Sequence, residues 1–290
     1  MQFQKAQRKK AKLRLALTGP SGSGKTYGAL LVAKGLGGKI ALIDTEKGSA
    51  SLYSHIADFD VLELLAPYSP ERFIDAINAA ESGGYDVLII DSTTHEWSGV
   101  GGCLELVDAV AKAKFKGNSW SAWNEVTPRH RKFIDTILQS PLHIIATMRS
   151  KTETAQVEVN GRKTVQKLGM KAEQRDGSEY EFTTVLDITH DGNLAMVSKD
   201  RTGLFKDPIQ LSERTGQMLI EWLESGKDPA AMDAEEVALA VEALNACESL
   251  GQAQGIFGGA WKRCPDGLKT SLKATYDKVK ADLAAQQEPA

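Results

Sequence analysis

The sequence predicts an α/β fold with a mainly parallel sheet that is covered by helices. Short, almost continuously apolar runs at residues 13–18, 39–46, 86–91 and 142–148 are typical of strands buried on both faces. Segments with helical periodicity separate these runs, so successive strands are expected to form βαβ units. A glycine-rich turn joins the first run to the helical segment that follows it.

Glycine and proline mark the ends of the expected helices. The first helix follows the glycine-rich turn and ends at Gly35, Gly37 and Gly38. The second has Ser69 as its N-cap, Pro70 in its first turn, and Gly83 and Gly84 at its end. Two further helices are expected near residues 103–114 and 120–138, before the fourth strand.

The pattern changes to antiparallel strands after residue 149. The segment AQVEVNGRKTVQKLG alternates around Asn160-Gly161, a dipeptide that favours a tight turn, and this predicts a β-hairpin extension. Two more antiparallel strands are expected to be joined at residues 190–193, and a helix in LSERTGQMLIEWLES closes the core.

The chain is expected to divide into a basic N-terminal tail (1–12), an α/β core (13–225), a linker (226–232) and a small helical domain (233–286). Asp233 is the expected N-cap of that last domain, with Glu236 three residues further on. No run of 18 apolar residues occurs and the basic N-terminus lacks the apolar segment of a signal peptide, so no membrane association is expected.

Composition limits the partners that the whole surface would attract. The 290 residues carry a formal net charge of −3, so nucleic-acid binding would require a local basic patch. Cys103, Cys247 and Cys264 lie far apart in the sequence without the spacing of metal ligands. They are interpreted as reduced thiols, which indicates a cytoplasmic protein.

The segment GPSGSGKT matches the phosphate-binding pattern G-x-x-x-x-G-K-[ST] between a strand and a helix, which identifies a P-loop. Its glycines allow backbone N–H groups to surround an anion at a helix N-terminus. Lys25 is expected to reach the β- and γ-phosphates of ATP, and the Thr26 hydroxyl to bind Mg²⁺. The predicted nucleotide-binding residues are Gly19, Pro20, Ser21, Gly22, Ser23, Gly24, Lys25, Thr26 and Tyr27.

Asp91 ends the apolar run VLIID and is the second predicted metal ligand. The next residue is Ser92, so a water-activating carboxylate must lie elsewhere. Glu46, just after the second strand, is expected at the same sheet edge as the P-loop. Glu96 is the competing candidate for the base, and its alternative role is to cap the loop that follows it.

The segment LIDTE, with IIDS in the third strand, resembles RecA-type ATPases, whose catalytic glutamate takes the position of Glu46. Across Leu13–Ser225 the order of elements is similar to phage-encoded recombination ATPases of the Sak single-strand annealing type. The resemblance implies a Mg²⁺-dependent, DNA-stimulated ATP hydrolase that forms a homo-oligomer in the cytoplasm of a bacterial host cell.

Two further sets of site residues follow from this resemblance. In RecA-type proteins, an Asn or Gln at the end of the fourth strand senses the γ-phosphate. This chain has Thr147, Met148 and Arg149 there, and Thr147 or Arg149 is the expected substitute. Lys199 and Arg201 are expected to act on a neighbouring subunit's nucleotide, and the alternative is an ion-paired cluster with Asp200 and Asp207.

The stretch 149–175 is net basic, and RecA-type proteins place DNA-binding loops here. The candidate DNA contacts are Lys151, Arg162, Lys163, Lys167 and Lys171. The hairpin lacks aromatic residues that would stack on bases, and a solvated hairpin packed on a neighbour is the alternative. Trp97, Trp120 and Trp123 in preceding segments are candidates for base stacking or for packing in the core or an interface.

Three functions are compatible with this pattern. The first is an ATPase that acts on single-stranded DNA in recombination or annealing, with a single-strand-binding or other recombination protein docking on the C-terminal helices. The second is a P-loop ATPase that regulates a protein assembly without DNA. The third is a small-molecule kinase, which ranks last because no compact lid segment is evident.

Overall fold

The computed structural model describes residues 8–159, 162–226, 231–232 and 234–285, without the side chains of residues 152–169 and 285. Contacts divide the chain into two compact units, Ala11–Glu224, and Ser225–Ala290 together with Met1–Lys10.

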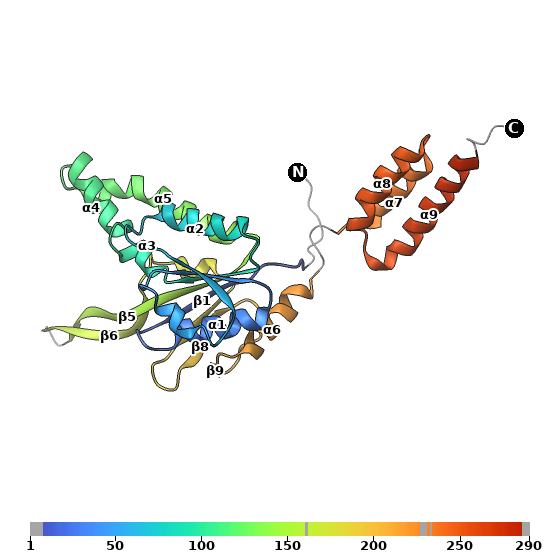
Figure 1. Cartoon of the computed structure of the whole chain (residues 1–290). Coiled ribbons are helices and arrows are strands. Elements are labelled where there is room, and N and C mark those ends of the chain that lie inside the picture. The colour runs from blue at the N-terminus through green and yellow to red at the C-terminus, as the bar shows by residue number, and fades with distance from the viewer. Residues whose placement is uncertain (1–7, 160–161, 227–230, 233, 286–290) are drawn as a thin grey trace. The chain divides into compact units, whose positions relative to one another are not determined.

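The larger unit is built on one mixed sheet (Figure 1). Its strands are β1 (Arg14–Gly19), β2 (Ile40–Asp44), β3 (Phe59–Glu63), β4 (Val87–Asp91), β5 (His143–Val159), β6 (Arg162–Ala172), β7 (Thr184–Ile188), β8 (Leu194–Asp200) and β9 (Ile209–Gln210). The order is β3-β2-β4-β5-β1-β7-β8-β9, and β6 pairs with β5. Strands from β3 to β7 in this order are parallel, whereas β6, β8 and β9 are antiparallel to their neighbours. The predicted mainly parallel α/β fold is confirmed.

Helices cover both faces of the sheet, which explains why its strands are almost continuously apolar. Helices α1 (Lys25–Leu36) and α6 (Glu213–Glu224) pack on one face with Leu15, Leu17 and Leu42. Helices α2 (Pro70–Ser82) and α5 (Ser119–Gln139) pack on the other face with Ile43, Leu88 and Ile90 (Figure 1). The short helix α3 (Thr94–Ser98) and helix α4 (Cys103–Lys114) complete this layer.

The parallel arrangement brings the carboxyl ends of the central strands to one edge. In the registers of the sheet, Asp44 at the end of β2 is level with Asp91 at the end of β4. Gly19 at the end of β1 is level with Arg149 in β5. Loops that leave this edge therefore place the P-loop and the expected acidic residues close together, as ligand sites of parallel sheets require.

Strands β3, β5 and β9 differ from the expectation, and the two-residue strand β9 is too short to give a sequence pattern. The edge strand β3 was missed because most of its residues are exposed, so it lacks the continuous apolar run of its neighbours. Strand β5 does not end after residue 148, because the chain continues without interruption from the sheet into the predicted hairpin. The hairpin and the antiparallel pair β7–β8 are confirmed, while the turn at 160–161 lies outside the described residues.

The C-terminal unit contains helices α7 (Ala234–Asn245), α8 (Leu250–Arg263) and α9 (Asp266–Ala285). They share an apolar core around Leu244, Ala253 and Leu272. The rings of Phe257 and Tyr276 stack with centroids 4.1 Å apart. The expected N-cap Asp233 lies outside the described residues. Within the described residues, no helix is both long and apolar enough to span a membrane.

Candidate functional site

The P-loop connects β1 to α1 through residues that adopt left-handed backbone angles. Gly22 and Gly24 have φ values of 79° and 84°, a region that side chains with a Cβ rarely enter. A Cβ on Gly19 would lie 2.5 Å from Ser23 Oγ, so glycine is also required by the close approach. Ser23 Oγ is buried and has no hydrogen-bond partner among the described residues. This loop has the shape and the free polar groups of a phosphate site.

Lys25 lies folded against the loop that carries it. Its Nζ donates to the carbonyl oxygens of Gly19 at 3.0 Å and Pro20 at 2.8 Å. Burial lowers the pKa of Lys25, while the nearby carboxylates of Asp91 and Glu46 raise it. The ammonium group is therefore held against the P-loop backbone, and the negative charges of Asp91 and Glu46 are close enough to stabilise its charged form.

Thr26 and Asp91 meet as the metal-site prediction requires. Thr26 Oγ1 donates to Asp91 Oδ2 at 2.5 Å, and Thr147 Oγ1 donates to Asp91 Oδ1 at 2.5 Å. Burial raises the pKa of Asp91, and the two hydroxyl hydrogen bonds oppose that rise. A hydroxyl and a carboxylate oxygen are hard donors of the type that Mg²⁺ prefers, so these residues fit that cation.

Glu46 follows β2 in a loop that Asp44 holds in place. The carboxylate of Asp44 accepts hydrogen bonds from the backbone N–H groups of Glu46 at 2.5 Å and Ala50 at 3.0 Å. Glu46 Oε1 accepts from Arg149 Nε at 3.0 Å and Nη2 at 2.7 Å. The side chain of Glu46 is 28% exposed, so water reaches its carboxylate.

Glu96 has different surroundings. Its side chain is fully buried, and His130 Nδ1 lies 3.1 and 3.2 Å from its two oxygens. Cys103 Sγ donates to Glu96 Oε1 at 3.1 Å. The loop-capping role considered for Glu96 is therefore wrong, because its carboxylate joins helices α3, α4 and α5 from inside.

Sequence reasoning missed the cluster formed by Glu96, Cys103 and His130. Their donor atoms lie within 4.8 Å of one another, a separation that would suit a metal ion. Burial and the charge of Glu96 raise the pKa of the Cys103 thiol. No spacing signal indicated this cluster, because its members come from three separate helices.

His95 supports the tip of β2. Its Nδ1 lies 2.6 Å from Thr45 Oγ1, and its ring stacks on Tyr68 with centroids 5.0 Å apart. Burial and the charge of Arg149 lower the pKa of His95, which favours the neutral ring. The Thr45 hydroxyl also accepts from the N–H of Ser92 at 2.8 Å. His95 therefore connects β2 to the segment after β4.

A cavity of about 310 Å³ adjoins the P-loop. Gly24 and Tyr27 line it together with Tyr53, Ile188, Asn193 and Gln210 from other elements. The rings of Tyr27 and Tyr53 meet edge to face at 6.1 Å, and Asn193 Nδ2 donates to the carbonyl oxygen of Ser23 at 2.8 Å. Aromatic edges beside a phosphate loop suit the base and sugar of a nucleotide. The residues that other elements contribute to this cavity were not predicted, because they lie far from the P-loop motif in sequence.

Lys199 and Arg201 lie near the end of β8. Lys199 Nζ donates to the carbonyl oxygen of Tyr180, and Arg201 Nη2 donates to the same oxygen at 3.4 Å. Asp200 instead accepts from the Thr202 N–H at 2.8 Å and the Thr202 hydroxyl at 2.6 Å. The described contacts thus differ from the ion-paired cluster with Asp200 that was considered as the alternative.

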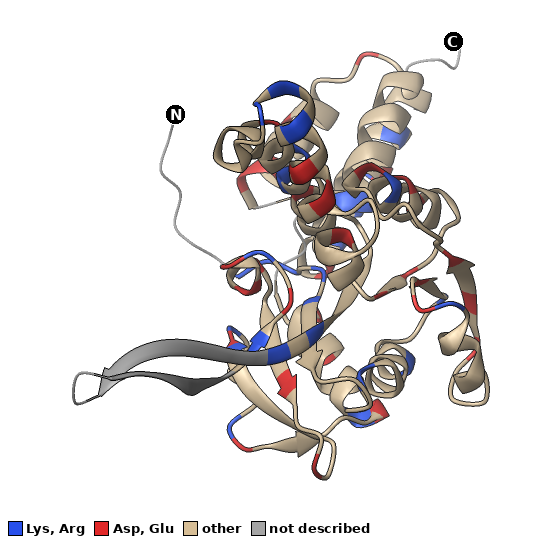
Figure 2. Cartoon of the chain, turned by 90° about the vertical axis from the view of Figure 1, so that its left-hand side faces the viewer, with Lys and Arg blue, Asp and Glu red and all other residues tan. Residues whose placement is uncertain are grey.

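Lys151 and Lys171, where the hairpin leaves the sheet, form the hairpin foot, and both take part in ion pairs. Lys151 and Lys171 are partners in the β5–β6 register. Lys151 lies 3.8 Å from Glu173, and Lys171 lies 2.9 Å from Asp176. Figure 2 colours basic residues blue on the described part of these strands. The side chains of three other predicted DNA contacts lie outside the described ones: Arg162, Lys163 and Lys167.

A family model described as an AAA domain matches residues 11–229, which covers the larger unit and a few residues after it. The search of curated proteins finds no match to the chain.

Proposed function

Because the chain belongs to the AAA domain family of nucleotide-binding P-loop ATPases, we propose that it hydrolyses ATP with Mg²⁺ while it acts on single-stranded DNA. The process would be homologous recombination or strand annealing of the type that phage-encoded RecA-like ATPases perform. The observation that carries this proposal is strand β5. It runs from the sheet edge, where Arg149 contacts Glu46, directly into the hairpin with its basic foot.

Each residue at the sheet edge has a role in the proposed reaction. Lys25 and the backbone N–H groups of residues 21–26 hold the β- and γ-phosphates, and the cavity beside Tyr27 holds the base and sugar. Thr26 and Asp91 would hold Mg²⁺, which supplies positive charge to the phosphate oxygens when bound. Thr147 and Arg149 are the groups that sense the γ-phosphate.

We assign the general base to Glu46 rather than Glu96. Glu46 is partly exposed at the edge that Lys25 and Asp91 share, and it lies close enough to both to affect their pKa values. Glu96 is fully buried against His130 and Cys103. A base must accept a proton from the attacking water, so a carboxylate with access to solvent at the phosphate site is required.

The test is the rate of ATP hydrolysis with and without single-stranded DNA, combined with DNA binding at two salt concentrations. Stimulation by DNA together with affinity that falls steeply with salt is expected, since phosphate contacts release counterions. A rate that is indifferent to DNA, in a protein that also fails to bind it at low salt, contradicts the DNA part of the proposal. Duplex DNA of the same length is the control in both the hydrolysis assay and the binding assay.

In this proposal the chain works as a homo-oligomer, in which Lys199 and Arg201 contact the nucleotide of a neighbouring subunit. Support comes from Arg201, which is exposed near the end of β8 and so is accessible to a neighbour. Mixing Lys25→Ala chains with Arg201→Ala chains would restore activity. One kind of mixed subunit interface would then combine an intact P-loop from one chain with an intact Arg201 from its neighbour. No recovery at any ratio would contradict the action of Arg201 on a neighbouring subunit's nucleotide. The C-terminal helices are the proposed docking site for a second recombination protein.

One observation favours a second function, an ATPase that switches a protein assembly without DNA. Both lysines at the hairpin foot already contact acidic residues, Glu173 and Asp176. Such charge pairing suits a protein surface as well as a phosphate backbone. DNA indifference in the hydrolysis assay, with turnover intact, would select this function.

A further inference from the structure

We propose that three tryptophans, Trp97, Trp120 and Trp123, form a groove that stacks the bases of single-stranded DNA. The proposal rests on the proposed function and names the part of the protein that contacts the bases. The groove is a hollow of about 340 Å³ that also includes Asn124 and Arg175. Ligand sites commonly have volumes of about 300–1,000 Å³.

Two of the tryptophans are fixed in place by packing beneath them. Trp97 and Trp123 stack on each other with ring centroids 5.5 Å apart and an interplanar angle of 21°. Both are partly buried against a small apolar cluster of α4 and α5 that includes Val107, Ala122 and Val126. A rigid aromatic surface loses little side-chain entropy when a planar ligand binds on it.

Trp120 lacks comparable burial. It lies in the first turn of α5 and is 85% exposed. A large aromatic side chain held in water beside two half-buried ones makes an exposed apolar surface of the kind that marks a binding site. A packing role in the subunit does not account for it, because so little of its surface is buried.

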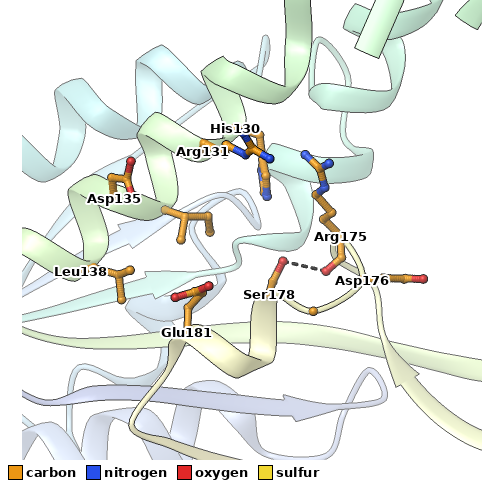
Figure 3. Close-up of a pocket in the computed structure, with 10 residues that line it drawn as sticks. His130, Arg131, Asp135, Leu138, Arg175, Asp176, Ser178 and Glu181 are labelled. Atoms are coloured by element: carbon orange, nitrogen blue, oxygen red, sulfur yellow. Dashed lines mark hydrogen bonds between the residues drawn. The ribbon is translucent and has the colours of Figure 1, made fainter. Parts of the chain in front are cut away.

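Arg175 supplies a cation on the same groove. Its guanidinium lies 5.7 Å from the centroid of the Trp123 ring. Its Nη1 is buried and has no hydrogen-bond partner among the described residues. Figure 3 shows Arg175 projecting from the segment after β6, where its carbonyl oxygen accepts from Ser178 Oγ at 2.7 Å. The guanidinium, held over the Trp123 ring, therefore has hydrogen-bonding capacity that the described residues do not use.

Charge selects a polyanion as the occupant. Arg175 lies three residues after the end of β6 and is followed by Asp176, which pairs with Lys171, so the chain links the groove to the base of the hairpin that carries Lys151 and Lys171. Both lysines pair with acidic residues through partly exposed ion pairs, which contribute little to stability and so hold the lysines only weakly. Tryptophan faces beside a cationic track match unpaired bases on a phosphate backbone. In a duplex, the base faces are already stacked and cannot enter the groove.

The groove also supplies the stacking side chains that the basic hairpin lacks. The basic hairpin has no aromatic residue, whereas single-strand sites usually combine cations with stacking side chains. The fold supplies them from α3 and α5. The hairpin and the helical layer would thus form one site, with the backbone bound by the first and the bases by the second.

The experiment compares two fluorescent probes on the full-length protein: an oligo(dT) of about twenty nucleotides and an abasic oligomer of the same length. The wild-type chain is expected to bind oligo(dT) about tenfold more tightly than the abasic probe, because stacking on one tryptophan provides an affinity gain of this order. Trp120→Ala should remove most of that preference and leave abasic binding unchanged. Trp120→Phe should restore much of it.

Leu104→Ala is the matched control, because Leu104 is a partly exposed apolar residue of the same helical layer that does not line the groove. Equal preference for oligo(dT) in the wild type and Trp120→Ala would overturn the inference and leave DNA binding itself intact. A Trp120→Ala chain that dissociates from its oligomer but keeps the preference would overturn it too, since the groove would then be a subunit contact. A wild-type chain that binds neither probe would contradict the proposed function together with this inference.

Discussion

Arg149 holds Glu46 by donating from both Nε and Nη2 to a single carboxylate oxygen, at 3.0 and 2.7 Å. Strand β4 lies between β2 and β5 in the sheet, so this pair passes across the end of β4, where Asp91 lies. The proposed base, the proposed phosphate sensor and the proposed metal ligand are thereby placed on three adjacent strands. Arg149 is also the last residue before β5 pairs with β6.

Glu46→Gln is expected to lower the rate of ATP hydrolysis by about 10²–10⁴-fold, because the amide cannot accept the proton of the attacking water. ATP binding should persist, since the phosphate loop is unchanged. Glu96→Gln is the matched control: the folded protein should turn over normally, although its stability falls as a buried interaction with His130 is weakened. Normal turnover in Glu46→Gln with loss in Glu96→Gln would reverse the assignment. Steady-state hydrolysis and equilibrium nucleotide binding measure both effects.

Arg149→Ala is expected to separate catalysis from stability. The pair with Glu46 is partly exposed, so its loss should change the free energy of unfolding by about 1 kcal/mol or less. Turnover should nevertheless fall about tenfold or more, because a cation at the terminal phosphate stabilises developing charge. Arg149→Lys keeps the charge but not the two-pronged donor, and an intermediate rate is expected. Thermal unfolding that drops sharply while turnover stays high would show that Arg149 is structural.

Thr147→Val should shift the pH dependence of hydrolysis. The Thr147 hydroxyl hydrogen bond lowers the pKa of Asp91 against the effect of burial, so its removal raises that pKa further. Protons compete with Mg²⁺ for the Asp91 carboxylate, and activity on the acid side is therefore lost at higher pH in the variant. Thr147→Ser retains the hydroxyl and should follow the wild-type profile. If activity on the acid side is lost at the same pH in Thr147→Val as in the wild type, Asp91 is not the group whose protonation limits hydrolysis at low pH.

His143 gives a prediction for stability against pH. Its Nδ1 accepts a hydrogen bond from the N–H of Leu13 at 3.1 Å. Burial and the charges of Lys12 and Arg14 lower the pKa of His143 from 6.5 to about 4. The unfolded chain takes up a proton below pH 6.5 while the folded chain does not, so stability is lost as the pH falls from about 6.5 to about 4. The loss should reach about 3 kcal/mol.

His143→Asn tests this expectation, because the amide oxygen can accept the same hydrogen bond without titrating. Urea unfolding followed by tryptophan fluorescence at pH 7 and pH 4.5 gives the comparison. The variant should lose less stability between the two pH values than the wild type. Parallel losses in both chains would assign the acid sensitivity to other groups.

Local sequence patterns predicted much of the fold because those patterns arise from contacts between near neighbours. The strand ending in Asp91 is buried along its whole length, and its unbroken apolar run showed this. Pro70 in the first turn of α2 and Gly84 after its end, with a φ of 70°, mark the bounds of this helix because of their own backbone preferences. Strand β3 escaped prediction, since an exposed edge strand carries no continuous apolar pattern.

By itself, the sequence determined the P-loop, the acidic residues Glu46 and Asp91 at the ends of strands, and the alternation of strands and helices. Each of these depends on residues that lie close together in the chain. Only the tertiary structure decided how those residues meet. Glu46 and Arg149 are 103 positions apart, and Glu96 and His130 are 34 positions apart. No local pattern specifies that one glutamate remains accessible to water while the other is enclosed. That difference follows from how helices pack on the sheet, and the same packing brings three tryptophans and an arginine from after β6 to one groove.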